Sequence, residues 1–262
     1  MSKRLIHQFR RNTGIRLGCL ALAFAPAIHA AKIPEHATAL STATQLIVVT
    51  TPDWNSTGGT LQRYARTARQ ESWQPVGDPI PVVVGKSGLG WGTGVMAVPE
   101  HHSQDPVKKE GDHRATAGIF RLGTAFGYAQ DKPANWTMPY LPLTPSVECV
   151  DDSHSKSYNR VVDRSRLQPD WNSSEHMRSE GEYYRWGIVI DQNPSRIPLG
   201  GSCVFMHVWG GDGQGTEGCT AMAQPNVEAV LAWLRSIAHP LLVQMPLSQY
   251  RQVHKVLHLP PQ

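Results

Sequence analysis

The sequence predicts a mainly β fold with short peripheral helices, on three observations. The 262-residue chain contains 20 prolines and 23 glycines, which stand between short apolar runs. That distribution favours strands joined by turns over bundles of helices. The run at 44–51 is rich in β-branched residues and is typical of a strand. With 40% hydrophobic residues, the chain has enough material for the core of one large domain.

The first 30 residues have the composition of a secretory signal peptide. Basic residues precede an apolar stretch at 17–24, and small residues end the segment at Ala30. The apolar stretch is too short for a lasting membrane anchor, and no later run reaches the roughly 18 apolar residues that a span needs. We therefore expect cleavage after Ala30 and a mature secreted protein, in the periplasm or beyond the cell, without a membrane span.

Charge argues against a nucleic-acid partner. Residues 1–30 contain five Lys or Arg and no Asp or Glu, so the remainder has 20 basic and 21 acidic residues and a formal charge of −1. Proteins that bind nucleic acid place clustered Lys and Arg against the phosphates. A near-neutral secreted enzyme is the better interpretation.

The elements of the mature chain can be placed in order. Residues 31–44 lack apolar periodicity and are expected to form a disordered or loosely attached leader. Strands are expected at 44–51, 60–71 and 79–85, which suggests an antiparallel meander. The polar segment 165–182 is expected to be an irregular insertion, either a lid above the site or a solvated loop.

The last third of the chain carries the most regular pattern. An apolar run at 202–209 predicts a buried strand that leaves through a glycine-rich loop at 210–215. Apolar residues at three- and four-residue spacing predict a helix at 225–239. A closing strand is expected at 241–245, and no structure is assigned to the tail at 248–262.

A histidine and a cysteine bracket the glycine-rich loop. His207 belongs to the predicted strand, and Cys219 begins the element after the loop. A thiol near its ordinary pKa of about 8.5 is a weak nucleophile and needs a base beside it, which His207 could supply. Gly218 leaves the backbone N–H groups of 218 and 219 open to an oxyanion. The alternative is a buried cysteine beside a strand histidine, without a catalytic role.

Two rival kinds of site are disfavoured. The run at 85–87 resembles the end of a phosphate-binding loop but lacks the first glycine of that motif. Histidines and aspartates at 101–113 and 151–154 raise the alternative of zinc, but none has the His-Glu-x-x-His spacing. Asp112 and Asp151 are expected to orient loops through backbone hydrogen bonds or to be solvated. We expect no metal and no cofactor.

The residues on both sides of the glycine-rich loop resemble the signature of the L,D-transpeptidase catalytic domain, or YkuD, family. The match comprises 205–209 and 216–222, with further similar stretches at 84–92, 109–112, 115–122, 149–152, 158–159, 175–177 and 184–190. Together they predict a YkuD-like domain at 45–247. The commoner form of the signature has arginine where this chain has Ala221, so the resemblance is to the divergent branch of the family.

The resemblance implies a sandwich-like β fold, a cysteine nucleophile and the peptide stem of peptidoglycan as substrate. Cys219 would attack the carbonyl between the third residue, a diamino acid, and a terminal D-amino acid, which forms a thioester. His207 would act as general base and acid, and the backbone N–H of Gly218 would hold the oxyanion. Thr216 is expected to orient the loop and to contact the substrate. Trp209 forms either a wall of the cleft or part of the core.

The resemblance leaves more than one function open. In L,D-transpeptidation a second amine resolves the thioester and makes a crosslink. Resolution by water would make the protein a carboxypeptidase or endopeptidase with the same Cys-His site. A catalytically silent wall-binding protein on the same fold is the third alternative. We expect a transpeptidase that acts as a monomer on peptidoglycan stem peptides.

Three cysteines remain after cleavage of the signal peptide. In an oxidising compartment this number suggests one disulfide and one free thiol. If Cys219 is the nucleophile, Cys149 and Cys203 form the bridge. A bridge between Cys203 and Cys219 is the alternative and would abolish activity. We favour the first pairing.

Overall fold

The structure, a computed structural model, is mainly β, as the sequence predicts. It describes residues 35–262 except 69–70 and 100–101. The predicted signal peptide at 1–30 lies outside the described residues. The described chain belongs to one compact unit. None of the described helices is long and apolar enough to cross a membrane.

Ten of the described strands form one hydrogen-bonded sheet. They are β1 (Gln45–Thr51), β2 (Gly58–Ala65), β3 (Gln74–Val83), β4 (Leu89–Trp91), β5 (Ala115–Gly127), β6 (Tyr140–Pro142), β10 (Trp186–Ile190), β11 (Phe205–Val208), β12 (Thr220–Met222) and β13 (Leu241–Pro246). Their order is β10-β11-β12-β3-β2-β1-β13-β5-β4, with β6 on β5. β1, β2 and β3 pair antiparallel, so the predicted meander is confirmed.

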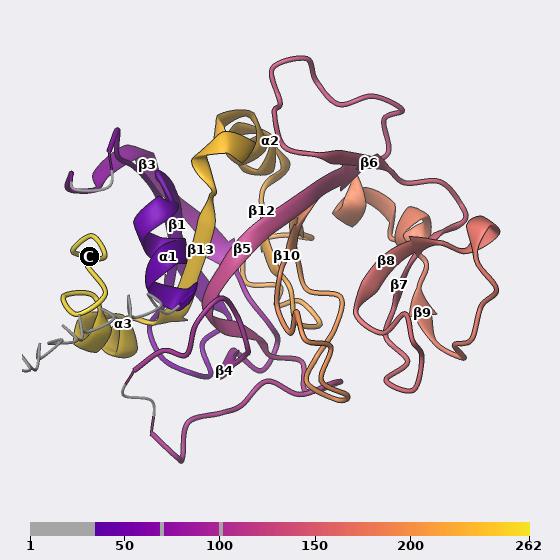
Figure 1. The fold of residues 1–262 in the computed structure, drawn as a ribbon, viewed down its shortest axis with the longest axis horizontal. Coiled ribbons are helices and arrows are strands. Elements are labelled where there is room, and N and C mark those ends of the chain that lie inside the picture. The colour runs from indigo at the N-terminus through magenta and orange to yellow at the C-terminus, as the bar shows by residue number, and fades with distance from the viewer. Residues whose placement is uncertain (1–34, 69–70, 100–101) are drawn as a thin grey trace, which may run out of the picture. The chain divides into compact units, whose positions relative to one another are not determined.

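The sheet closes on itself because β5 is long enough to serve two partners. Its residues 118–121 pair with β13, and its residues 122–127 pair with β10. The register shifts between Ile188 and Ile190 of β10, an irregularity of the kind that bends and twists strands. Figure 1 shows β5 as one long arrow that runs from the neighbourhood of β4 to that of β6.

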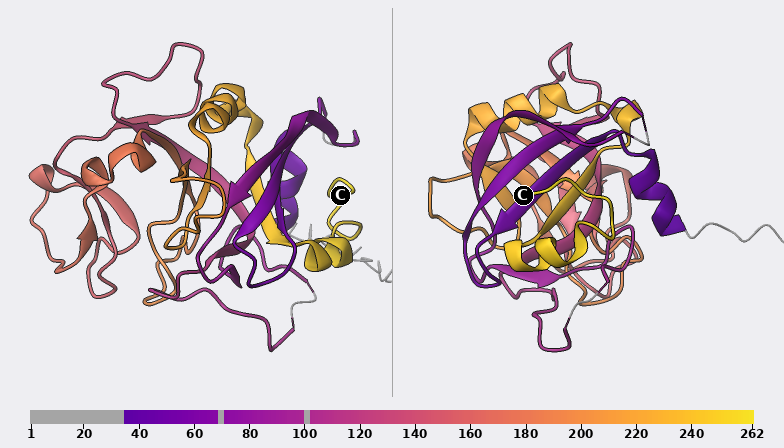
Figure 2. Two further views of the ribbon diagram at one scale, coloured as in Figure 1. Left: turned by 180° about the vertical axis from the view of Figure 1, so that it is seen from behind. Right: turned by 90° about the vertical axis from the view of Figure 1, so that its left-hand side faces the viewer.

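Three α-helices of the described chain lie on the outside of this sheet (Figure 2). They are α1 (Glu35–Thr42), α2 (Gln224–Trp233) and α3 (Leu247–Val253). α2 confirms the predicted helix but ends at Trp233, before the 3-10 turn η4 (Ser236–Ala238). The side chain of Gln45 explains this end. Its Nε2 donates to the Trp233 carbonyl at 2.8 Å, and its Oε1 accepts from the Arg235 N–H at 2.7 Å.

The expectation of an unstructured leader is wrong for residues 35–42, which form α1. The guanidinium of Arg66 holds the end of this helix, since it donates to the carbonyl oxygens of Leu40 at 2.5 Å and Ala43 at 3.0 Å. Free carbonyl groups at a helix end need such partners. A side chain from the segment directly after β2 therefore stabilises a helix whose own apolar pattern is weak.

The C-terminal tail, to which the sequence assigned no structure, packs onto the sheet as α3. Tyr250 and Val253 are at most 1% exposed, and the Tyr250 hydroxyl donates to the Pro260 carbonyl at 2.7 Å. α3 contacts both β1 and β13. Burial of each large apolar side chain contributes about 1.5–3 kcal/mol. The folded domain thus extends past residue 247.

A second, three-stranded sheet is formed by β7 (Val147–Val150), β8 (Arg160–Asp163) and β9 (Ser174–Glu175) in the order β8-β7-β9. In Figure 1 these strands lie together on one side of the large sheet. The 3-10 turns η1 (Arg164–Arg166), η2 (Met177–Ser179) and η3 (Gly181–Tyr184) complete this region. The predicted insertion at 165–182 is therefore a series of short ordered elements.

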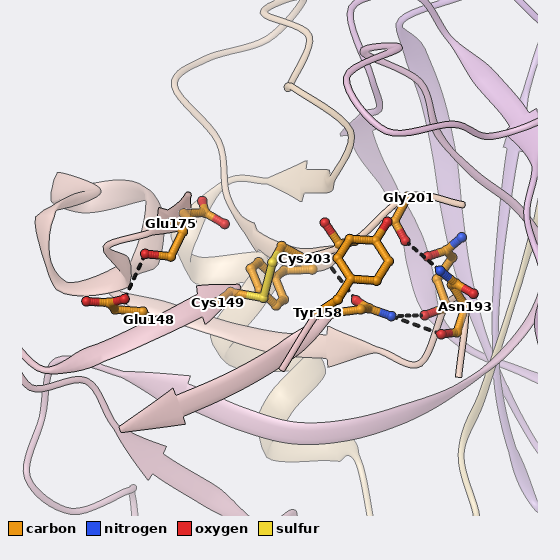
Figure 3. The surroundings of a disulfide bond; sticks show 12 residues. Glu148, Cys149, Tyr158, Glu175, Asn193, Gly201 and Cys203 are labelled. Carbon is orange, nitrogen blue, oxygen red and sulfur yellow. Dashed lines mark hydrogen bonds between the residues drawn. A yellow bond between two sulfur atoms is a disulfide. The ribbon is translucent and has the colours of Figure 1, made fainter. Parts of the chain in front are cut away.

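The predicted Cys149–Cys203 bridge is present and joins β7 to the segment before β11 (Figure 3). Cys219 is a free cysteine, so the alternative bridge is not formed. The side chain of Asn159 supports the bridge, because its Oδ1 accepts from the Cys203 N–H at 3.0 Å and its Nδ2 donates to the Asn193 carbonyl at 3.1 Å. The bridge therefore ties the small sheet to the start of β11 in the large one.

Candidate active site

Two neighbouring parallel strands bring Cys219 and His207 together. The chain leaves β11 after Val208 and returns in β12, where Ala221 pairs with His207. In that register Cys219, one residue before β12, lies beside Phe205, whose backbone N–H donates to Sγ at 3.3 Å. Paired residues of a sheet share a face, and so do residues two apart along a strand. The thiol and the imidazole therefore belong to one face of the β11–β12 pair.

The imidazole of His207 is buried and neutral. Its Nδ1 lies 2.7 Å from the carbonyl oxygen of Val208. Because a carbonyl only accepts, Nδ1 carries the proton and Nε2 has the free lone pair. Burial lowers the pKa of His207 to about 4, and the Val208 hydrogen bond only partly offsets this effect. At neutral pH the ring can accept a proton through Nε2.

The thiol of Cys219 is also neutral at rest. The residue is 8% exposed, and its S–H donates to the Cys203 carbonyl at 3.7 Å. Burial raises the pKa of Cys219 to about 12, and the Glu175 carboxylate acts in the same direction. The Phe205 N–H and the Lys108 ammonium act in the opposite direction. Such a thiol is a poor nucleophile until a base takes its proton.

Thr216 holds the loop that carries the cysteine. Its hydroxyl donates to the Cys219 carbonyl at 2.6 Å and accepts from the Gly218 N–H at 3.2 Å. Gly218 has a φ of +152°, in the region that glycine adopts at little cost. The Gly218 N–H is bound to Thr216 in the resting site, and its role toward an oxyanion stays a prediction.

A cavity of about 710 Å³ opens at the thiol and the imidazole. Small-molecule sites typically enclose roughly 300–1,000 Å³. Trp209 is half-buried and lines this cavity, so of its two predicted roles the structure shows the cleft wall. Besides Cys219, His207 and two tyrosines, the titratable side chains of the lining are Lys86, Lys108, Glu110, His113, Asp151, Glu175, Glu180 and Glu217. Carboxylates therefore outnumber cations around the thiol.

Glu175 is a site residue to which the sequence assigned no role. It belongs to β9 and lies near the Cys149–Cys203 bridge (Figure 3). Burial raises the pKa of Glu175 to about 7, and the hydroxyl of Tyr184, which donates to its carboxylate, opposes this rise. The one signal in the sequence was its place in the similar stretch at 175–177.

The two aspartates predicted to orient loops differ. Asp112 confirms the prediction, since its carboxylate accepts from the backbone N–H groups of Lys109 at 2.7 Å and Arg114 at 2.9 Å. Asp151 lines the cavity, and its buried Oδ1 has no hydrogen-bond partner. This oxygen therefore lacks the loop contact that the sequence suggested.

Comparison of the chain with protein-family models, with characterised proteins and with solved structures finds no match. The resemblance to the YkuD signature thus rests on the residues of this chain alone. Across residues 35–262 without the two gaps, no group of three or more His, Cys, Asp or Glu side chains is placed to hold a metal ion.

Proposed function

We propose that this protein is a cysteine-dependent L,D-transpeptidase that acts on peptidoglycan stem peptides in the periplasm. One observation carries the proposal: a free thiol and an imidazole with an unprotonated Nε2 line the same cavity on adjacent parallel strands. The resemblance to the YkuD signature supplies the substrate class. The disulfide and the predicted signal peptide support the oxidising compartment.

The acyl transfer takes place in two halves. As Cys219 Sγ bonds to the carbonyl carbon of the donor stem, the thiol proton passes to His207 Nε2 and the π electron pair moves to oxygen. The imidazolium then gives its proton to the leaving nitrogen while the C–N bond breaks, which yields a thioester and a free D-amino acid. An acceptor amine reverses these steps and releases the crosslinked product and the thiol.

The neutral resting pair suits this order of events. A free thiolate in the buried site is disfavoured, because burial and Glu175 both raise the pKa of Cys219. Proton transfer that accompanies the attack on carbon avoids this thiolate. The bond from His207 Nδ1 to the Val208 carbonyl keeps Nε2 as the acceptor and stabilises the imidazolium once it forms.

The test is incubation of the mature protein with disaccharide tetrapeptide stems, followed by chromatography and intact mass. Cys219→Ala should abolish every stem-derived product. Gln214→Ala, at an exposed residue that lines the same cavity, is the control and should retain most activity. Dimers joined through their third residues support the proposal.

Three other outcomes would contradict it in different ways. Tripeptides alone would indicate a hydrolase with the same nucleophile. Unchanged turnover by Cys219→Ala would refute the cysteine mechanism. Absence of both product and thioester adduct in the wild-type protein would favour the silent wall-binding alternative.

A further inference from the structure

Lys108 is a buried cation in the wall of the candidate active site. Its side chain is 5% exposed, yet it lines the cavity that holds Cys219. A Cβ atom added to Gly218 would lie 3.6 Å from Lys108 Nζ. The ammonium therefore borders the residue directly before the nucleophile. Burial of an ammonium is costly unless polar partners surround it.

Two acceptors hold this ammonium. Nζ donates to the Lys109 carbonyl at 2.8 Å and to Asp112 Oδ1 at 2.5 Å. Asp112 is itself fixed by the backbone N–H groups of Lys109 and Arg114. A lysine ammonium has three N–H donors. These two contacts leave one N–H for a ligand in the cavity.

The other basic side chains of the cavity outside the Cys219–His207 pair lie in a different environment. Lys86 and His113 both pair with Glu217, and their side chains are 54% and 52% exposed. Solvent and salt screen exposed charges of this kind. Lys108 is the cation of the described lining that is both buried and next to the nucleophile loop.

Negative charge at the nucleophile faces carboxylates in the cavity, and of the two backbone N–H groups that the sequence predicts as donors, those of Gly218 and Cys219, the first is already bound. Asp151, Glu175 and Glu180 all line this cavity, and the Gly218 N–H is bound to Thr216. An oxyanion is stabilised best by a donor that is already in position and needs no rearrangement. Lys108, which the Asp112 loop holds in place, meets this requirement.

We propose that Lys108 is a further catalytic residue, whose ammonium donates a hydrogen bond to the carbonyl oxygen of the tetrahedral intermediate on Cys219. As the Sγ–carbon bond forms, the π electron pair moves onto that oxygen and the thiol proton passes to His207. Lys108 keeps all its protons. On collapse the pair returns to the C=O bond and the C–N bond breaks. This inference rests on the proposed acyl transfer.

The experiment compares wild-type protein, Lys108→Met and Asp112→Asn in two assays. Steady-state turnover of tetrapeptide stems gives kcat and KM. The rate of Cys219 alkylation by iodoacetamide, followed by mass from pH 6 to pH 10, reports the thiol without any peptidoglycan substrate. Circular dichroism and thermal unfolding establish that each variant is folded.

Lys108→Met should lower kcat on the order of 100-fold, the usual effect of losing one oxyanion donor, with little change in KM. Its alkylation at pH 8 should be slower, because loss of a nearby cation raises the pKa of the thiol. Asp112→Asn should have the opposite effect on alkylation, since it removes the carboxylate that offsets the ammonium. If the loop had a purely structural role, the alkylation rate would change in the same direction in both variants.

Four results would overturn the inference. One is a raised KM with unchanged kcat in Lys108→Met, which would indicate that Lys108 grips a substrate carboxylate. Another is that Lys108→Met has the same turnover and the same alkylation rate as the wild-type protein. The third is a shift of both variants in the same direction. The fourth applies if Lys108→Met does not fold: it is a rate of Cys219 alkylation in Asp112→Asn that is no faster than in the wild-type protein. Failure of the proposed function is distinct, because the wild-type protein would then give no Cys219-dependent product.

Discussion

The two sides of the cavity are built by different means. On one side, β11 and β12 belong to the closed sheet, and its backbone pairing places His207 and Cys219. On the other side lie the short strands of the small sheet and the 3-10 turns that follow it. Here β9 supplies Glu175 and η3 supplies Tyr183. Most of the first side packs into the larger of two apolar clusters, whereas the second side packs into a smaller cluster, which Phe205 and Cys219 also join.

Polar contacts and one covalent bond add to the small apolar cluster under the small sheet. Glu148 of β7 has a fully buried carboxylate, which accepts from Trp171 at 3.0 Å and Ser174 at 2.7 Å. Arg164 adds an ion pair at 2.8 Å. Burial alone would raise the pKa of Glu148, but these hydrogen bonds and the Arg164 charge outweigh it and lower the pKa overall. Strands of two to four residues need such additional ties.

The difference between the two sides indicates where atoms have to be positioned precisely. The proposed proton transfer requires that its donor and acceptor atoms come within hydrogen-bond reach, and the pairing of β11 with β12 holds His207 and Cys219 on one face for it. The small sheet contributes charges that shift the pKa of the thiol and shape the cavity. Changes on the large-sheet side should therefore affect the chemical step, and changes on the small-sheet side should affect stability and pH dependence.

The largest expected effect is on the large-sheet side. His207→Gln should lower kcat by about 10³-fold or more, because no base takes the thiol proton. His113→Gln is the matched control, since His113 lines the same cavity but has an exposed side chain that pairs with Glu217. Steady-state turnover of tetrapeptide stems measures both. Equal losses of kcat in the two variants would contradict a specific role of His207 as the base.

The next effect is on the small-sheet side. The Cys149→Ala and Cys203→Ala double variant should lose about 4 kcal/mol of unfolding free energy, because the bridge closes a 54-residue separation. Cys219 should still react with iodoacetamide, since β11 and β12 hold it. Urea unfolding measures the first result and intact mass the second. An unchanged urea midpoint would contradict a structural role for the bridge.

The smallest expected effect concerns Glu175. Its pKa is raised from 4.5 to about 7 by burial, so its contribution to stability is present below pH 4.5 and is lost as the pH rises through 7. The reason is that the unfolded chain releases the proton first. Glu175→Gln carries no charge and should be more stable than wild type by about 1–3 kcal/mol at pH 8, with no gain at pH 4.

Urea unfolding of both proteins from pH 4 to pH 8 checks this prediction. His207 has a lowered pKa, which makes stability rise with pH between about 4 and 6.5. Both proteins contain His207, so its contribution cancels when the stability of one is subtracted from that of the other at each pH. Glu180→Gln, at a half-buried carboxylate of the same cavity, serves as the control. A difference that does not grow with pH would show that Glu175 is not held in its neutral form.

Elements with a strong local pattern could be predicted from the sequence. The strands at β1 and β13 and the start of α2 lie where β-branched runs and helical spacing place them. The end of α2 could not be predicted, because the Gln45 side chain that ends it comes from β1, far away in the chain. α1 likewise depends on Arg66 of the segment after β2.

By itself the sequence determined the mainly β class, the strand before the glycine-rich loop and the pair of candidate residues, His207 and Cys219. These features depend on local spacing and residue type. Only the tertiary structure decided the closure of the sheet through β5, the charge state of the thiol and the presence of Lys108 and Glu175 beside it. A pKa depends on burial and on charges brought near by folding, and here those charges come from β9 and from the loop before β5.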